Sequence, residues 1–465
     1  MDDAAIGFMP ARAMAAAIAA KILSPVEVAG AVLRRIERLN PRLNAFAHLD
    51  PEGAMAAARA AEAAVMRGDP LGPLHGVTVT VKDMMAVAGM PTARGSLTAR
   101  VMPDEDTPFV GRLRAAGATV LGKTTTSEFG WSGVSHSPAT GLTHNPWGHG
   151  LNAGASSAGA GVAAAAGFGP LHQGSDGAGS VRMPAHFCGV VGLKPSFGRI
   201  PYLPVPNNDY MSHIGPLTRT VDDTALMLGV MAGAHPWDTT TLDGVVDTSP
   251  AALAGGVRGL RVAFSPDLGG TRVDPEVAAL VAAAAKTFAA MGAHVEQVTP
   301  PWGADGPALI RDLWSVHMAA NAHLLPEWAG RMDPGLVACI RGAAGVTAEH
   351  YMATRARKYA YATAIHRWFD GWDLLLTPAV SVAAFPVERL MPADWPGHEW
   401  DWLQWAEFSY PFNIAQNPAI SVPCGLTRAG LPVGLQIVGR RLDDTGVLRA
   451  ATAFEAAQPW PQAPV

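Results

Sequence analysis

Two glycine-rich bends in the middle of the chain present serine hydroxyls, which can act as nucleophiles. The first bend, residues 152–159, carries Ser156 and Ser157. The second reads Gly174-Ser175-Asp176-Gly177-Ala178-Gly179-Ser180-Val-Arg182-Met-Pro184. Glycine-rich backbone can turn several N–H groups toward one point, as the oxyanion formed by attack on a carbonyl requires. This pattern predicts a nucleophile, Ser180, beside an oxyanion hole whose candidate donors are the amides of Gly177, Ala178, Gly179 and Ser180.

A run of glycine and serine can also be an ordinary loop, and that alternative stays open for either bend taken alone. Two bends that bracket a helix of small residues favour a site. Asp176 and Arg182 lie on either side of the second bend and are available to pair and fix its shape. Lys82 lies at the end of a valine-rich strand, where a solvated strand-end lysine is one open alternative.

Three other motifs match known patterns but lack their structural context. Residues 117–124 fit the P-loop of nucleotide hydrolases, yet a helix precedes them and their variable positions read as a strand. Residues 159–164 fit a relaxed dinucleotide-binding pattern with no preceding strand, so helix packing by small residues explains them better. Residues 155–159 approach a G-x-S-x-G nucleophile elbow without its first glycine. The histidines show no metal-ligand spacing, so we expect neither a metal nor a cofactor.

An alternation of helices and strands must hold these side chains. Ser24, Pro25 and Glu27 form a helix start that apolar residues follow at helical spacing, and a second helix is expected over residues 50–67. Valines alternate over residues 77–82, which predicts a strand ending at the lysine. A helix over 109–116 and a strand over 118–121 follow. We therefore expect an α/β fold with helices on both faces of its sheet.

Composition favours one large globular domain. The 465 residues are 49% hydrophobic and 16% charged, below the usual charged share of about a quarter. We expect a single domain over 1–465, with a helical part at 1–70, a core with the reactive residues at 71–235, and a C-terminal part at 236–465. Residues 238–256 read as a loop within the last part.

Charge, cysteines and hydropathy exclude several classes of protein. A net charge of -5 gives no electrostatic footprint for nucleic acid or an anionic membrane. Cys188, Cys339 and Cys424 are odd in number and widely separated, which indicates a reducing compartment rather than a disulfide framework. Neither a signal peptide nor an apolar run of about 20 residues is found. We expect a cytoplasmic protein with no nucleic-acid or membrane partner.

The bends and several further segments resemble the amidase signature family. Residues 154–195 are similar to its GGSSGGS-like segment, its G-[ST]-D-x-G-G-S-[IV]-R-x-P segment and its CGVVGLKP segment. The resemblance continues in chain order at residues 76–83, 95–96, 117–129, 215–219, 373–378, 418–423 and 430–436. It implies a large mixed, twisted β-sheet covered on both faces by α-helices, and a serine-dependent hydrolase of linear amides.

The resemblance also implies a Ser-cisSer-Lys triad. Ser180 would be the nucleophile, Ser156 the serine preceded by a cis peptide bond, and Lys82 the base. Lysine accepts a proton only when neutral, so burial must lower the pKa of Lys82 from its free value of about 10.4. Ser157, Asp176 and Arg182 would support the site.

The sequence departs from the family pattern in both bends. Ala178 replaces the usual second glycine, and Ala155, Ala158 and Ala160 replace two glycines and a serine in the GGSSGGS-like segment. Alanine keeps its N–H but disfavours positive φ, so the oxyanion hole requires ordinary dihedrals at position 178. Gln416, where many members have glycine, is a further departure.

Residues 394–412 are an aromatic segment that precedes an expected strand, and in similar proteins the stretch before this strand helps form the substrate pocket. These rings are either core residues or pocket walls, and with Tyr202 and Met85 they favour a roomy apolar pocket. The predicted substrate contacts are Met84, Tyr210, Trp402 and Gln416. We expect a neutral, hydrophobic or aryl amide such as an anilide, with carbamates (urethanes) and esters as further substrates of the acyl-enzyme.

Two alternatives remain at this stage. One is the A subunit of a glutamine-dependent tRNA amidotransferase, which would need glutamine recognition and partner subunits. The other is a catalytically inactive binding or scaffold protein. The expected partner is otherwise a small-molecule amide or carbamate substrate, bound by a monomer or homodimer.

Overall fold

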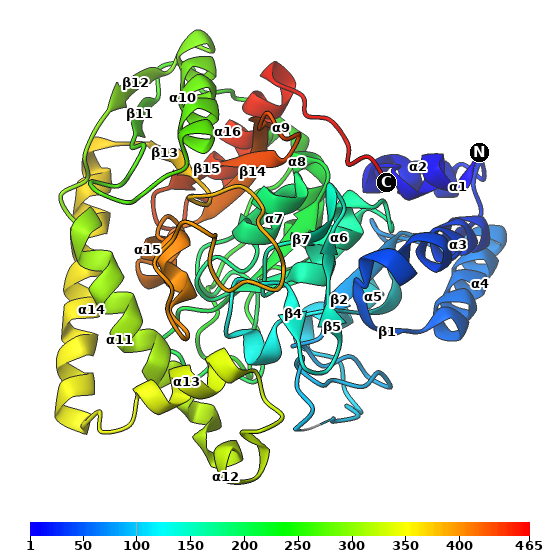
Figure 1. Ribbon diagram of the computed structural model, residues 1–465. Helices are drawn as coiled ribbons and strands as arrows, with labels where there is room; N and C mark the ends of the chain where they lie inside the picture. The colour runs from blue at the N-terminus through cyan, green and yellow to red at the C-terminus, as the bar shows by residue number, and fades with distance from the viewer. Residues whose placement is uncertain (99) are drawn as a thin grey trace.

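A mixed β-sheet forms the centre of the computed structural model, which describes residues 1–98 and 100–465 (Figure 1). Within these residues the sheet has 11 strands in the order β1-β3-β2-β8-β10-β9-β14-β15-β13-β11-β12. In that order the strands are Phe46–Leu49, Thr119–Thr124, Thr78–Lys82, Leu171–Asp176, His213–Thr218, Val191–Lys194, Ala419–Leu426, Pro432–Gly439, Leu374–Pro378, Arg261–Phe264 and His294–Gln297.

The strand directions divide the sheet into three zones. β3, β2 and β8 run parallel to one another, as do β13, β11 and β12. The strands between these groups pair antiparallel. Since β2 and β8 are parallel neighbours, their carboxyl ends meet at one edge of the sheet. Two small hairpins, β4-β5 (His136–Ser137, Gly141–Leu142) and β6-β7 (His144–Asn145, Gly148–Asn152), lead into the first serine-bearing bend.

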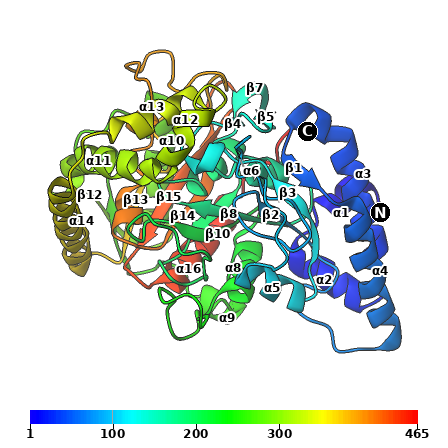
Figure 2. The same ribbon diagram turned by 90° about the horizontal axis from the view of Figure 1, so that it is seen from below.

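Helices cover both faces of the sheet, as expected. Figure 2 shows α8 and α16 on one side of the strands and α6 and α11 on the other. The first side carries α5 (Pro108–Ala115), α8 (Val221–Met231), α9 (Pro250–Leu253), α10 (Pro275–Ala290) and α16 (Asp444–Ala457). The other side carries α6 (Ala158–Ala165), α7 (Arg182–Cys188), α11 (Gly306–Met318), α12 (Leu325–Trp328), α13 (Pro334–Gly342), α14 (Ala348–Trp368) and α15 (Pro411–Ile414).

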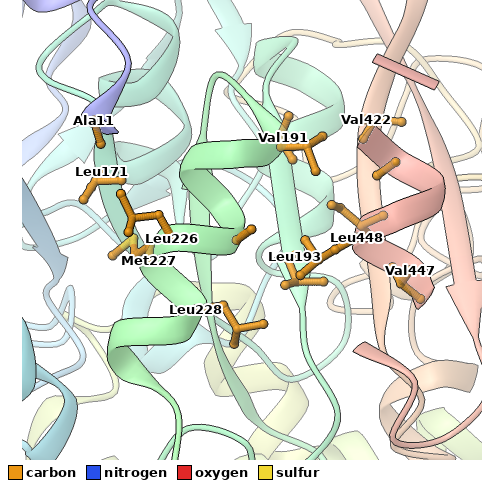
Figure 3. Close-up of a cluster of buried hydrophobic side chains, with 14 of the residues drawn as sticks. Ala11, Leu171, Val191, Leu193, Leu226, Met227, Leu228, Val422, Val447 and Leu448 are labelled. Atoms are coloured by element: carbon orange, nitrogen blue, oxygen red, sulfur yellow. The ribbon is translucent and has the colours of Figure 1, made fainter. Parts of the chain in front are cut away.

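Alternation along the strands fills a separate core on each face. In β13, Leu374 and Leu376 join one apolar cluster and Leu375 joins the other. Figure 3 shows the first cluster, where Leu226 and Leu228 of α8 and Leu448 of α16 pack against strand residues such as Val191 and Val422. The second cluster is dominated by aromatic rings.

The N-terminal region confirms the expected helix starts and adds an edge strand. Here α1 (Asp3–Gly7), α2 (Ala11–Ala19), α3 (Pro25–Leu43) and α4 (Pro51–Arg67) form a helical layer. Ser24 and Glu27 make the reciprocal capping contacts at the start of α3. The strand β1 lies within the part expected to be helical and pairs with β3. Short 3₁₀ turns span Glu128–Gly130, Gly303–Asp305, Ala319–Leu324, Phe369–Gly371 and Trp402–Trp405.

The P-loop-like and dinucleotide-like segments lie in the elements expected from their sequence context. The lysine and threonine of the P-loop-like segment belong to strand β3, with no helix nucleated there. The dinucleotide-like segment lies inside α6, where a Cβ at Gly159 would come within 2.1 Å of the Ala45 carbonyl oxygen. Small residues there serve close packing. Among residues 1–98 and 100–465, none of the helices has the length and apolar character needed to cross a membrane.

Candidate active site

Lys82 stands at the carboxyl end of β2 and points into the protein interior. Its side chain has no exposed surface. Its Nζ lies 2.7 Å from Ser156 Oγ and 3.0 Å from Ser175 Oγ. The backbone N–H of Lys82 donates to Gln173 Oε1 at 3.0 Å, which fixes the end of β2 against β8. The alternative of a solvated strand-end lysine is therefore wrong.

The burial of Lys82 changes its proton affinity. Loss of hydration lowers the pKa of Lys82 from 10.5 to about 7, against an opposing effect of the Asp176 carboxylate. A large fraction of the amine is then neutral near neutral pH and can accept a proton. The pKa of Lys82 is therefore lowered by burial, as a base at this position requires.

The first bend places Ser156 between β7 and α6. The peptide bond between Ala155 and Ser156 is cis, as the family resemblance implies. Gly154 has φ of 73°, and a Cβ there would lie 2.7 Å from the backbone N of Pro184. Glycine is therefore needed where the first bend passes against the second.

The second bend connects β8 to α7 and carries Ser180 beside the first. The N–H of Ser157 donates to the Ser180 carbonyl at 3.2 Å. Ser157 Oγ donates to the Ser175 carbonyl at 3.1 Å and accepts from the Ser175 N–H at 3.2 Å. Ser156 and Ser180 are each 3% exposed, so both side chains are almost fully buried.

A buried ion pair shapes the second bend. Arg182 binds Asp176 with two contacts of 2.9 Å, Nε to Oδ2 and Nη2 to Oδ1. Burial alone would raise the pKa of Asp176, but the charge and hydrogen bonds of Arg182 hold that pKa below its ordinary value. The remaining guanidinium hydrogens bind Ser409 O, Gln436 Oε1 and Asn413 Oδ1. Both charges are thus fully partnered, as a buried pair must be.

The oxyanion hole needs one correction. The Gly179 N–H donates to Asp176 Oδ1 at 2.7 Å, so it is committed to the ion pair and is not free to bind an oxyanion. The amides of Gly177, Ala178 and Ser180 have no hydrogen-bond acceptor within the described part of the chain. Ala178 lies outside the left-handed region, so its Cβ is compatible with the bend.

The predicted substrate contacts separate into two groups. Trp402 has no exposed surface, and its indole Nε1 donates to the Trp131 carbonyl at 2.7 Å. It is a core residue, so the predicted contact is wrong. Met84 is half-buried beside Gly130, whereas Tyr210 is 44% exposed. Gln416 donates to the Tyr210 carbonyl at 3.5 Å and has φ of 62°, a conformation in which glycine is the favoured residue.

Four further rings of the aromatic segment are also core, whereas Trp400 is half-buried and lines a surface pocket with His398 and Glu399. Trp405, Phe408, Tyr410 and Phe412 are each 1% exposed or less. The segment touches the site through a polar residue instead, because Ser409 Oγ donates to the Ala178 carbonyl at 2.7 Å. For these rings the core alternative is therefore correct and the pocket wall is wrong.

Similarity to known proteins identifies the family of this chain. A family model described as Amidase matches residues 27–448. The chain belongs to the amidase family. The amidase is 40% identical to an acylamidase of Rhodococcus erythropolis, with 99% of this chain and 98% of the relative covered. It is 36% identical to the A subunit of a glutamyl-tRNA(Gln) amidotransferase of Anaeromyxobacter sp. (strain K), with 96% and 95% covered.

A solved structure agrees with the fold of the amidase. The crystal structure of a bacterial aryl acylamidase of the amidase signature family superposes with a TM-score of 0.90 at 29% identity, and 97% of each chain is covered. The amidase is accordingly a hydrolase of amide C–N bonds with the mixed sheet expected from its sequence.

Several residues that shape the site of the amidase were not predicted from the sequence. Ser175 contacts Lys82, and Ser409, Asn413 and Gln436 surround Arg182. Gln436 ends one of the matching segments, which is a signal that could have identified it. A Cβ at Gly130 would lie 3.2 Å from Ser156 Oγ, so the backbone just before Trp131 passes directly beside the first bend.

No group of three or more His, Cys, Asp or Glu side chains that could hold a metal ion occurs in residues 1–98 and 100–465.

Proposed function

We propose that this amidase hydrolyses neutral, hydrophobic or aryl amides through an acyl-enzyme on Ser180. The contact of 2.7 Å between the buried Lys82 Nζ and Ser156 Oγ carries the proposal. It joins a lysine whose pKa is lowered to about 7 to a hydroxyl on the bend next to Ser180. Such a pair can remove a proton from a nucleophile that has no histidine partner.

The reaction has two halves. Ser180 Oγ attacks the amide carbonyl while its proton passes by way of Ser156 to the neutral Lys82. The amides of Gly177, Ala178 and Ser180 stabilise the negative oxygen of the tetrahedral intermediate. The C–N bond then breaks, and the departing amine takes the proton back from the lysine. In the second half, water attacks the acyl-enzyme with the same proton path and releases the acid.

Asp176 and Arg182 support this reaction without taking part in proton transfer. Arg182 holds the Asp176 carboxylate, which in turn receives the N–H groups of Gly179 and Val181. These bonds fix the bend so that the other amides face one point. The resulting hole is preorganised, which is the property that makes such donors effective.

The substrate class is supported by the relatives and by the polarity of the site. An acylamidase is 40% identical to this chain, and the aryl acylamidase structure shares its fold. Met84, next to Gly130 and so close to Ser156, brings an apolar group rather than a charge. An anilide is the preferred substrate, and carbamates and esters pass through the same tetrahedral geometry.

The A subunit of a tRNA amidotransferase is the second candidate, because a relative of that name is 36% identical over nearly the whole chain. This role requires glutaminase activity that depends on partner subunits. A panel of anilides, aliphatic amides, urethanes and glutamine separates the two roles. Turnover of glutamine alone, and only with added partner subunits, would replace the acylamidase proposal.

Substitution of Ser180 tests the mechanism. Ser180→Ala and Lys82→Ala are expected to reduce kcat on p-nitroacetanilide by at least about a thousandfold, since each removes a group needed for attack. Ser265→Ala is the matched control, because Ser265 is also a buried serine and follows β11, which five strands separate from β8. Wild-type turnover in Ser180→Ala would refute the mechanism.

A further inference from the structure

Asp209 lies in the loop between β9 and β10 and is held by two helices. Its carboxylate accepts hydrogen bonds from Tyr351 Oη at 2.5 Å and from Arg355 Nε at 2.7 Å, both on α14. On α11, His317 Nε2 lies 3.6 Å from the same carboxylate, and Lys358 Nζ of α14 donates to the Asp209 carbonyl. The Asp209 side chain is 7% exposed. It is therefore a buried anchor rather than a surface charge.

The backbone at this anchor has a conformation that residues with side chains rarely adopt. Asp209 has φ of 51° and Tyr210 has φ of 62°. Two consecutive left-handed residues without glycine persist only where the surrounding structure holds them. The contacts with α14 supply that hold, and the orientation of Tyr210 follows from it. Its ring packs against Phe197, with centroids 5.6 Å apart.

The same stretch of backbone reaches the bend that carries Ser180. A Cβ at Gly177 would lie 3.1 Å from Ser212 Oγ. Asn413 Nδ2 donates both to the Met211 carbonyl at 3.1 Å and to the Asp176 carbonyl at 2.9 Å. Residues 209–212 therefore connect the anchor on α14 to this bend.

We propose that Asp209 is a positioning residue for substrate binding, which acts by fixing Tyr210 beside the bend that carries Ser180, so that the phenol ring contacts the organic group of the amide. The inference rests on the proposed function, since Ser212, two residues after Tyr210, lies against the bend that presents the nucleophile. Asp209 itself touches no reacting atom. Loss of the anchor therefore weakens substrate binding and leaves the chemical step in place.

The substitution Asp209→Asn isolates the anchor. Asparagine tolerates left-handed backbone as well as aspartate does, so the change removes the charge without adding a backbone penalty. We expect KM for p-nitroacetanilide to rise about fivefold while kcat stays within about twofold of wild type. In a Tyr210→Ala background, Asp209→Asn should raise KM no further, because the residue through which it acts is gone.

Asp312→Asn is the matched control. Asp312 of α11 pairs with Arg357 of α14 at 3.1 Å, so it joins the same two helices through an exposed ion pair away from residues 209–212. It should leave KM unchanged. If Asp209→Asn proves unstable, Tyr351→Phe removes one donor to the carboxylate without altering the loop and should raise KM in the same direction.

Two results would overturn the inference. One is a KM in Asp209→Asn and Tyr351→Phe equal to that of the control. The other is a full, independent effect of Asp209→Asn in the Tyr210→Ala background. Failure of the proposed function is seen separately, as turnover that survives in Ser180→Ala. If Ser180→Ala is inactive and Asp209→Asn has an unchanged KM, the proposed triad stands and the proposed role of Asp209 is refuted.

Discussion

At the residue level, the protonation state of Lys82 links burial to chemistry. The amine is surrounded by backbone and hydroxyl groups and lies near one carboxylate, so its neutral form is favoured over its charged form. The same burial that would destabilise a purely structural lysine would give the proposed mechanism its base at neutral pH. Poor solvation of Lys82 thus favours the neutral amine, which is the form that can accept a proton.

This burial predicts a pH dependence of activity. kcat/KM should rise with pH and reach half its maximum near the Lys82 pKa of about 7, because only the neutral amine accepts the proton. The folded-state pKa lies below the unfolded value of 10.5, so the unfolded chain binds more protons between these limits. The contribution of Lys82 to stability therefore increases with pH from about 7 to 10.5. Initial rates measured across the pH range check the rise of kcat/KM, and a kcat/KM that stays constant through pH 7 would contradict it.

Arg182 offers a test of the ion pair that shapes the bend. Arg182→Ala leaves Asp176 as an unpaired buried charge and should lower the free energy of unfolding by about 3–5 kcal/mol. Arg67→Ala breaks an exposed ion pair with Asp69 and should change the free energy of unfolding by less than about 1 kcal/mol. Urea unfolding of both variants makes the comparison. Similar losses in the two would mean that the buried pair is not a stabilising contact.

At the level of elements, close packing of α6 positions the first bend. A Cβ at Gly159 would meet the Ala45 carbonyl at 2.1 Å, whereas a Cβ at Gly111 of α5 would meet nothing within 4 Å. Gly159→Ala should therefore lower stability by about 1–3 kcal/mol and reduce activity by displacing Ser156. Gly111→Ala, in a helix of the same length, should raise stability by about 0.5–1 kcal/mol. Melting temperatures and turnover of both variants test this, and equal behaviour would contradict it.

Local patterns predicted these elements well. The capping residues of α3 and the valine alternation of β2 act over a few residues, so the sequence reveals them directly. The strand expected at 118–121 extends to Thr124, because its end pairs with both β1 and β2. Element boundaries thus depend on neighbours that local reasoning does not include.

Long-range contacts at the site were less predictable. The family resemblance predicted that Lys82, Ser156 and Ser180 lie close together, and the structure brings the two bends and the end of β2 into one region. Arg182 also binds Asn413, 231 positions away, and Gln436, 254 positions away. Trp402 was misassigned because an indole at a core position and one at a pocket wall have the same sequence signal.

At the level of the whole molecule, one sheet joins distant parts of the chain. β9 pairs with β14, so a strand from residues 71–235 lies beside one from residues 236–465. The bend that carries Ser180 receives contacts from both parts, through Lys82 on one side and Ser409 on the other. The site is therefore built from both parts of the chain, which the sheet holds together.

The reactivity of the three cysteines can show whether the folded molecule opens locally. Cys188, Cys339 and Cys424 are free and buried, and burial raises the pKa of each thiol, that of Cys424 to about 12. Ellman's reagent should react with none of them in the folded protein and with all three after unfolding. A reducing agent should leave the melting temperature unchanged. Rapid reaction of one thiol under native conditions would mean that its region opens locally.

The carbonyl of Trp131 accepts hydrogen bonds from the indoles of Trp314 at 3.0 Å and Trp402 at 2.7 Å, and these two rings lie 5.7 Å apart. Indoles this close share their electronic excitation, so the group should give a coupled circular dichroism signal in the ultraviolet. Because the residue before Trp131 lies against Ser156, arrival of an acyl group on the neighbouring Ser180 should perturb this signal. Under the proposed mechanism this group would therefore serve as an optical probe of acylation, which stopped-flow spectroscopy could follow without a label.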